Sequence, residues 1–542
     1  MSSGGRVDKM KKNIAWGTFS RIIVMIYSFV SRTIFIQTLG ATCQGLNGLF
    51  SNILTMLSFA ELGIGTAMNF SLYKLVAEQD IPKIKAYMGF YKKAYRVIAA
   101  VVAGVGICIM PLLPFILKNT DLTGVNGNMY VIYSLFLFNT VCSYFVSYKY
   151  SLSNAEQKNY IFTNINLIFN LVCQTGQLVV LAVTNNFVVY CCVGAVVQLV
   201  QNLVTNWYMN KIYPYLKDKD VEKLSKEDLK EIVKNVKALV ISRIGGLLVT
   251  ATDNIIITTV LGAASVGFVD NYNTLLKNVN GFVKIVMDAQ TASFGNLIAT
   301  ESKEKIYRLF KNFRFLTFWM YGFISVACFS LMTPFVVVWL GTDMTVTAAT
   351  VALILINNYI AGHNSCVYNV KVAGGLFQQD QFLAFATAGV NLVVSIGLSK
   401  LIGLPGIFIG TLFTYLLEDA VRPHIIYKYI FEEKTIKYYI NSVKYLAMVL
   451  ISGGICYAAQ QFLFADSVYA RVVGKHFNER LRSAGVEFLW RFGLMTVIAV
   501  VVPNLLFFLV YRKTEEFKYL KDIFAKVGRK LTGKFRKKKA TV

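Results

Sequence analysis

Apolar runs long enough to cross a bilayer repeat along the whole chain, and they constrain the fold more than any other feature. A helix of about 20 apolar residues spans the hydrocarbon core. Of the 542 residues, 55% are hydrophobic and 15% are charged. The sequence therefore predicts an all-α polytopic membrane protein. We expect fourteen transmembrane helices, near residues 14–37, 46–72, 95–117, 129–150, 161–184, 186–210, 238–261, 266–298, 315–340, 345–370, 381–402, 404–427, 441–464 and 487–511.

Basic residues gather in alternate loops, which predicts how the chain is oriented. They are dense at the N-terminus and in loops 74–96, 211–237, 303–314 and 428–444, and nearly absent from loops 38–45, 118–128 and 341–345. Basic loops stay on the cytoplasmic side. We expect a multi-pass protein of the plasma or inner membrane with both termini in the cytoplasm. Only loop 465–486, outside in this topology, is basic against the trend.

The net charge of +26 does not indicate nucleic-acid binding, because the positive charge follows the membrane topology. The basic tail "GRKLTGKFRKKK" is most simply a contact with anionic membrane lipids. The nine cysteines lie mostly in apolar runs without a CxxC pair, and the three histidines are too scattered to bind one metal ion. There is no phosphate-binding glycine loop. We therefore expect no metal, no cofactor, no catalytic residue and no enzymatic activity.

An internal repeat divides the chain into two lobes. "SRIIVMIYSFVSRTIFIQTLGATCQG" at 20–45 matches "SRIGGLLVTATDNIIITTVLGAASVG" at 242–267 at a constant offset of 222 residues. Six predicted spans precede the second copy, so both copies cross the membrane in the same direction. Parallel repeats of this kind are typical of transporters. The duplication predicts that Gly40 and Gly262 occupy equivalent places, at the ends of spans one and seven.

The repeat gives five segments in chain order. We expect an N-lobe at 1–210, a cytoplasmic amphipathic linker at 211–237, and a C-lobe at 238–430. Two further spans follow at 431–511, and a basic cytoplasmic tail occupies 512–542.

Several motifs resemble a known family. "RTIFIQTLG", "GLNGLFSNILTMLSFAELGIGTAM" and "IGLPGIFIGTLFTYL", together with the duplicated lobes, resemble the polysaccharide-exporter branch of the multidrug/oligosaccharidyl-lipid/polysaccharide exporter superfamily. This branch comprises Wzx-type flippases and is related to lipid II flippases. The resemblance implies two lobes that work by alternating access, and an undecaprenyl-diphosphate-linked oligosaccharide as the substrate.

Charged residues within the predicted spans are the candidates for a substrate-binding cavity. Arg21 and Arg32 share one face of span one, because eleven residues make three helical turns with about 20° left over. A charge facing lipid costs about 2.5–3.5 kcal/mol, so this face should look toward protein or water. Arginine binds phosphate oxygens bidentately. Arg21 and its counterpart Arg243 have the alternative of anchoring helix ends at the interface. The full candidate set is Arg21, Arg32, Glu61, Arg243, Asp253, Asp270, Lys277, Lys284 and Asp288.

Span eight carries polar side chains along one stripe, from Asp270 through Lys277 and Lys284 to Asp288. This pattern indicates either a wet cavity or an internal Lys284–Asp288 ion pair. In span two, Glu61 has three interpretations: it neutralises an arginine of span one, binds a coupling cation, or lies near a boundary with little effect. Our sharpest hypothesis is that Arg32 contacts the substrate diphosphate, with Lys277 and Lys284 approaching from the other lobe.

Two other polar groups carry weaker expectations. Polar residues of span ten, such as His363 and Lys371 with nearby asparagines, suggest a face that hydrogen-bonds sugars. The end of span twelve carries four polar residues that suggest a solvated pairing near the cytoplasm: Glu418, Asp419, Arg422 and His424.

Two function classes remain open. The first is a flippase for a lipid-linked oligosaccharide, with Na⁺ or H⁺ coupling as an option and with polysaccharide polymerase and glycosyltransferases as candidate partners. The second is a cation-coupled exporter of small-molecule drugs, or a lipid II flippase, of the same superfamily. Basic cavity residues and two extra spans favour the first.

Overall fold

A computed structural model gives the fold of the chain. It describes residues 3–61, 68, 72, 75–76, 78–156, 158, 160–218, 224–230, 232–233, 252–374, 376, 379–380, 382–464 and 477–522. Throughout these ranges the chain is helical or in turns and contains no strand. The predicted all-α polytopic fold class is confirmed. The chain divides into two compact units, Met1–Asp270 and Asn271–Val542, which we describe separately.

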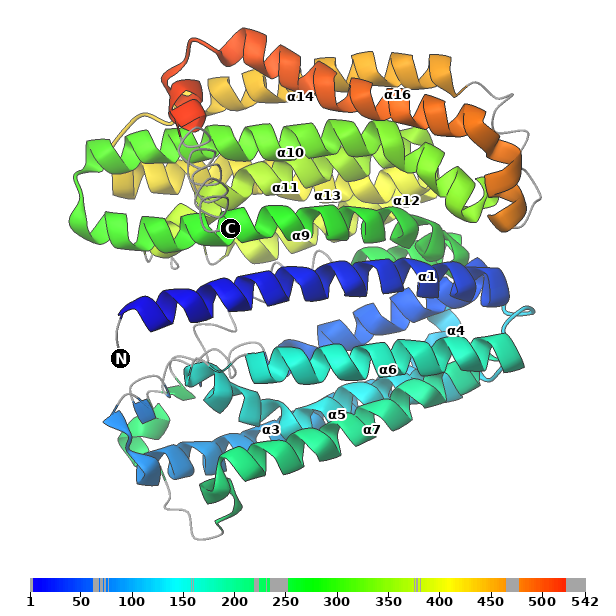
Figure 1. Ribbon diagram of the computed structural model, residues 1–542, viewed down its shortest axis with the longest axis vertical. Helices are drawn as coiled ribbons and strands as arrows, with labels where there is room; N and C mark the ends of the chain where they lie inside the picture. Colours follow the sequence, from blue (N-terminus) through cyan, green and yellow to red (C-terminus); the bar gives the residue numbers. More distant parts are fainter. Residues whose placement is uncertain are drawn as a thin grey trace, which may run out of the picture. The chain divides into compact units, whose positions relative to one another are not determined.

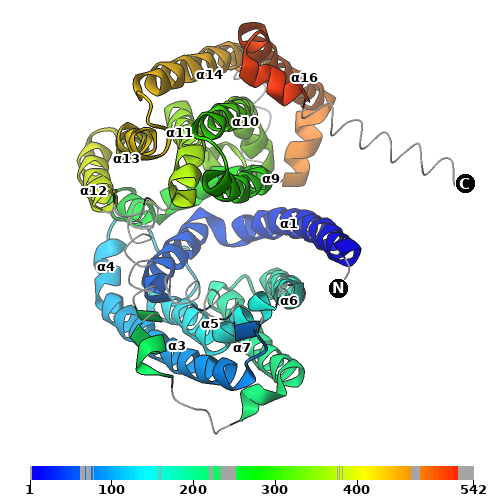
Figure 2. The same cartoon turned by 90° about the vertical axis from the view of Figure 1, so that its left-hand side faces the viewer.

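The first unit is built from long helices and short turns between them. They are α1 (Ser3–Leu57), η1 (Ser58–Glu61), α3 (Ile81–Ile109), η2 (Met110–Leu112), α4 (Leu113–Ile116), α5 (Met129–Ala155), α6 (Tyr160–Thr184), α7 (Phe187–Ile212), η3 (Pro214–Lys217), a helix at Thr252–Leu261, and the first turns of α9 (Ala263–Thr300). Helix α5 packs between α3 and α7, and α6 packs on α7 and α1, as Figure 1 and Figure 2 show.

The second unit continues α9 and adds six further long helices. They are α10 (Lys303–Leu340), α11 (Ala348–Ala373), α12 (Leu383–Ile402), α13 (Leu404–Ile426), α14 (Ile436–Leu463) and α16 (Phe477–Tyr511), with short turns η4 (Thr342–Met344) and η5 (Tyr427–Phe431). Helix α11 packs against α10 and α13. Helices α14 and α16, which carry predicted spans thirteen and fourteen, dock on α10 (Figure 1).

Aromatic packing explains why α14 and α16 attach to α10. Phe318 of α10 stacks on Tyr445 of α14, with ring centroids 4.2 Å apart, and Phe507 of α16 lies 4.8 Å from Phe318. All three rings are buried. Such ring pairs add about 0.5–1.5 kcal/mol each beyond the area they bury. The two extra helices are therefore a fixed part of the second unit.

Local sequence signals set several helix starts. Asp80 caps α3 by accepting from the backbone N–H of Lys83, and Asn186 caps α7 by accepting from two backbone N–H groups. These short polar side chains satisfy N–H groups that have no partner within the helix. The two caps therefore fix where α3 and α7 begin.

The two glycines that the duplication pairs are both in left-handed backbone conformation. Gly40 interrupts α1 with φ +79°, and Gly262 separates the helix 252–261 from α9 with φ +88°. Only glycine adopts such angles without steric cost. The "LGA" motif therefore ends a helix at the same repeat position in both copies, as the duplication predicts.

Repeat-equivalent residues also contact each other in a reciprocal way. A Cβ on Gly45 would lie 1.7 Å from the carbonyl oxygen of Ala263, and a Cβ on Gly267 would lie 2.6 Å from that of Ala41. Ala41 corresponds to Ala263 and Gly45 to Gly267 at the offset of 222. A reciprocal contact of this type is what two-fold-related segments make. This backbone crossing lies within the first unit.

The loop after α4 hydrogen-bonds to the chain on both sides of the break at Gly262. The side-chain amide of Asn119 donates to the carbonyl oxygens of Thr259 and Val260, at 2.6 and 3.3 Å. The hydroxyl of Thr120 accepts from the backbone N–H of Ala263 at 3.0 Å. These bonds satisfy the ends of both helices, which matters because an unpaired backbone group is costly away from water.

Nine helices in the described ranges are long and apolar enough to cross a membrane. The long helices α1, α9 and α11 are not among them, and only residues 252–261 of predicted span seven are described. These elements carry predicted spans one, two, seven, eight and ten, which hold the charged and amide side chains of the candidate cavity. The polar side chains of α9 and α11 fit helices that face protein or water rather than lipid.

Candidate functional site

Arg32 of α1 forms an ion pair with Asp270 in the second turn of α9. Its Nη1 donates to Asp270 Oδ2 at 2.9 Å, and the two side chains are 9% and 20% exposed. The amide of Gln44 donates to the same oxygen at 3.2 Å. Because the break at Gly40 redirects the chain, residues from both sides of it reach one carboxylate. Arg32 thus avoids lipid, as the sequence predicts.

Glu61 does not pair with Arg32, which has a different carboxylate partner. The carboxylate of Glu61, in the turn η1, accepts a hydrogen bond from the hydroxyl of Tyr95 at 3.0 Å. Within the part of the chain that the structure describes, Glu61 forms no ion pair, and Arg32 pairs with Asp270 instead. The physical reason is position: α1 ends at Leu57, and the turn after it presents Glu61 to α3. Because the side chain of Arg21 lies outside the described residues, all three interpretations of Glu61 stay predictions.

Helix α9 exposes two lysines of the predicted polar stripe. Lys277 and Lys284 are exposed, and in the described ranges neither enters an ion pair. They follow Asp270 at intervals of seven residues, which keeps them on one side of the helix. The side chain of Asp288 lies outside the described residues, so the predicted Lys284–Asp288 pair does too.

The remaining candidates are located only in part. Asp253 is half-buried and lies in the helical segment 252–261. Arg21 lies on α1, but its side chain is outside the described residues, as is the whole of Arg243. Their membership of a cavity stays a prediction.

The polar residues of span ten do not form a free sugar-binding face, and that expectation is corrected. Asn357 and Asn364 of α11 are buried, and their amides donate to the carbonyl oxygens of Phe408 and Tyr415, at 2.9 and 3.2 Å. Both acceptors belong to α13, which packs along α11. Buried amides that bond backbone carbonyls join helices within a membrane.

His363 of α11 is also buried, against Arg314 of α10. The Arg314 guanidinium donates to the carbonyl oxygen of Tyr438 at 2.7 Å and lies 3.7 Å from the centroid of that ring. It also donates to the hydroxyl of Ser442. Arg314 thereby ties α10 to α14, and His363 belongs to that structural contact.

The charges at the end of span twelve are buried rather than solvated. Lys371 and Arg422 both donate to Asp380, at 2.6 and 3.2 Å, and Arg422 donates to Glu418 at 2.6 Å. The four side chains are 5–15% exposed. The sequence suggests only the Glu418–Arg422 pair, because helical spacing brings those two together. It gives no signal that Asp380, in the loop after α11, joins two helices.

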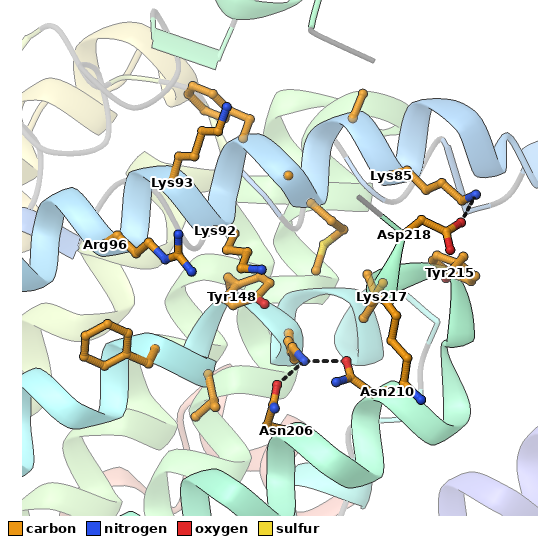
Figure 3. A pocket seen from close by; sticks show the side chains of 18 of the residues that line it. Lys85, Lys92, Lys93, Arg96, Tyr148, Asn206, Asn210, Tyr215, Lys217 and Asp218 are labelled. Atoms are coloured by element: carbon orange, nitrogen blue, oxygen red, sulfur yellow. Dashed lines mark hydrogen bonds and ion pairs between the residues drawn. The ribbon is translucent and has the colours of Figure 1, made fainter. Parts of the chain in front are cut away.

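One cavity was not predicted from the sequence. It measures about 1060 Å³ and lies within the first unit, among α3, α5, α7 and the turn η3 (Figure 3). Lys85, Lys92 and Arg96 of α3 line it. Their spacing of seven and eleven residues places the three cations on one face of α3, which is the signal that the sequence holds for this cavity.

Comparison with known proteins identifies the family. The sequence model of the family described as "Polysaccharide biosynthesis protein" matches residues 10–294. The chain belongs to this family. A search of curated proteins finds no match.

Solved structures share the fold. A lipid II flippase, MurJ, in an inward closed conformation is similar with a TM-score of 0.58 and 13% identity, over 91% of this chain and 98% of that one. An inward-facing multidrug resistance MATE family transporter of the MOP superfamily has a TM-score of 0.53 and 14% identity, over 74% of this chain and 96% of that one. A MATE transporter from Vibrio cholerae has a TM-score of 0.52 and 13% identity, over 77% of this chain and 96% of that one. The protein is a multi-pass membrane protein with a MOP-superfamily transporter fold.

Proposed function

We propose that this protein is a flippase that moves an undecaprenyl-diphosphate-linked oligosaccharide, a precursor of a cell-surface polysaccharide, from the cytoplasmic to the outer leaflet. The observation that carries the proposal is the pair of exposed lysines on α9, Lys277 and Lys284. An ammonium group facing lipid costs about 2.5–3.5 kcal/mol, so two on one side of a membrane helix require a water-filled cavity. Their charge suits a diphosphate.

The substrate itself requires such a cavity. Its polyprenyl tail gains about 0.8 kcal/mol per buried CH₂ and stays in the bilayer. Its diphosphate and sugars cannot cross the hydrocarbon unaided, because unpaired polar groups are too costly there. A carrier with a polar cavity open to lipid on one side, working by alternating access, solves both problems.

In this proposal Arg32 binds the diphosphate when the carrier is loaded. Its guanidinium is held by Asp270 in the conformation described here. The planar donors of arginine match phosphate oxygens bidentately, so phosphate is a suitable replacement partner. We propose that Arg32 exchanges Asp270 for the substrate during the cycle. Arg21, Arg243, Glu61, Asp253 and Asp288 complete the proposed cavity, and Glu61 is the proposed site of Na⁺ or H⁺ coupling.

The alternative is a cation-coupled drug exporter or a lipid II flippase of the same superfamily. A cavity for cationic drugs would be acidic, whereas α9 exposes lysines. The fold likeness also extends over more of this chain for the lipid II flippase than for the MATE transporters, 91% against 74–77%. The family description favours a polysaccharide precursor over lipid II. We place the protein in the plasma or inner membrane with cytoplasmic termini, beside glycosyltransferases and a polymerase.

Depletion of the protein in cells tests this proposal. The lipid-linked oligosaccharide should accumulate on the cytoplasmic leaflet, and wild-type protein should clear it. Lys277→Gln with Lys284→Gln should fail to clear it although the protein reaches normal abundance. Unchanged precursor levels, with increased sensitivity to cationic drugs, would support the exporter instead.

A further inference from the structure

The cavity within the first unit has a strongly basic lining. It measures about 1060 Å³, in the upper size range of ligand-binding pockets. Over the described residues, one carboxylate lines it, that of Asp218, against six basic side chains. The six are Lys85, Lys92, Lys93, Arg96, Lys149 and Lys217.

Lys149 of α5 is a buried cation without a counter-ion in the described ranges. The residue is 2% exposed, and its ammonium donates to the amide oxygens of Asn206 and Asn210 of α7, at 2.5 and 2.6 Å (Figure 3). The two asparagines are one helical turn apart, so both face Lys149. Amide oxygens solvate the charge but do not neutralise it. A buried charge left unneutralised costs several kcal/mol, so an anion in the cavity would stabilise this arrangement.

Lys92 and Arg96 supply exposed cations beside Lys149. Both are exposed, and in the described part of the chain neither enters an ion pair, whereas Lys85 is paired with Asp218. Figure 3 shows the side chains of Lys92 and Arg96 extending from α3 into the cavity that Lys149 also lines. Burial, with a smaller effect of Glu156, raises the pKa of Tyr215 to about 12, so this phenol stays neutral and adds no negative charge. The cavity therefore has the charge of an anion site.

The same cavity is also apolar on one side. Phe145 of α5 and Leu199 and Leu203 of α7 line it and are 53%, 43% and 66% exposed. Exposed side chains of this kind on membrane helices contact lipid. A ligand that fits has an anionic head for the cations and an apolar chain for this side.

We propose that this cavity binds the phosphate headgroup of an anionic lipid of the cytoplasmic leaflet. Arg96 and Lys92 contact the phosphate, and Lys149 supplies a buried positive charge behind them. A free phosphate or diphosphate shares the headgroup chemistry, but it leaves the apolar side of the cavity without a partner. This site lies within the first unit alone and does not depend on the proposed flippase function.

Lipid binding by the purified full-length protein in detergent tests the proposal. The probes are dioleoyl phosphatidylglycerol, neutral dioleoyl phosphatidylcholine, and free pyrophosphate as a competitor, with bound lipid counted by native mass spectrometry. We expect the wild type to retain phosphatidylglycerol about tenfold more than phosphatidylcholine, equivalent to about 1.4 kcal/mol. The double variant Lys92→Gln/Arg96→Gln should lose this preference. Both residues are exposed, so the variant should fold.

The matched control is Lys83→Gln/Lys211→Gln. These two lysines are exposed on α3 and α7 and do not line the cavity. Replacing them removes the same charge as the cavity variant does. The control should keep the wild-type preference. Equal retention by the cavity variant and the control would overturn the proposal, since binding would then reflect overall charge. Displacement of the lipid by an equal concentration of pyrophosphate would overturn the assignment to a lipid.

Discussion

Removing Arg32 should separate its structural role from its proposed role in export. In Arg32→Ala, the Asp270 carboxylate keeps only the Gln44 amide as its observed partner. Loss of one partner from a buried ion pair costs about 3–5 kcal/mol. Asp270 is 20% exposed, so we expect the lower end, about 3 kcal/mol, or roughly a 150-fold shift of the unfolding equilibrium. Thermal unfolding of the purified protein measures this loss.

The double variant Arg32→Ala/Asp270→Ala decides between the two roles. It leaves no unpaired charge, so stability should return to within about 1 kcal/mol of the wild type. Export, measured by clearance of lipid-linked oligosaccharide in depleted cells, should stay abolished because the phosphate contact is missing. Arg32→Lys should keep part of the activity, since it retains the charge but loses the bidentate fork. Export by the double variant at the wild-type rate would refute the substrate role and leave Arg32 as half of a structural pair.

Three further outcomes are expected. Reporter domains fused at Lys118 and Lys219 should lie outside and inside the cell respectively, and the reverse would contradict the predicted topology. Gly45→Ala should reduce the amount of folded protein, because its Cβ would lie 1.7 Å from a backbone oxygen, whereas Gly104→Ala, with open space around it, should not. Equal yields of the two variants would contradict the close backbone contact between Gly45 and Ala263. Asp380→Asn should lower the melting temperature by leaving two cations without a full counter-charge, and an unchanged melting temperature would argue against the buried cluster.

The sequence was enough to predict the all-α polytopic fold class, because hydrophobic spans leave a strong local signal. The glycine break at residues 40 and 262 was also predictable, since a repeated "LGA" at constant offset implies a shared backbone feature. The partner of Arg32 could not be predicted from the sequence. A helical wheel shows which residues share a face, but not which helix that face meets, and Asp270 is 238 positions away in the chain.

The buried amides of α11 show a second limit of sequence interpretation. Asparagine and histidine within a span indicate that a helix avoids lipid, and α11 does pack between α10 and α13. Whether such side chains bind a ligand or a neighbouring carbonyl depends on the contacts of each helix. Asn357 bonds the backbone of α13 and is buried, so its amide does not face an open cavity.

The central claim is that the protein moves a lipid-linked oligosaccharide across the membrane. Its most direct test uses proteoliposomes that contain the purified protein and an undecaprenyl-diphosphate-linked oligosaccharide, with transport read as the fraction accessible to an external sugar-modifying enzyme. The account predicts that accessibility rises with the wild type and stays at the protein-free level with Arg32→Ala/Asp270→Ala. Protein-free accessibility with folded wild type, tested with and without gradients of Na⁺ and H⁺, would contradict it.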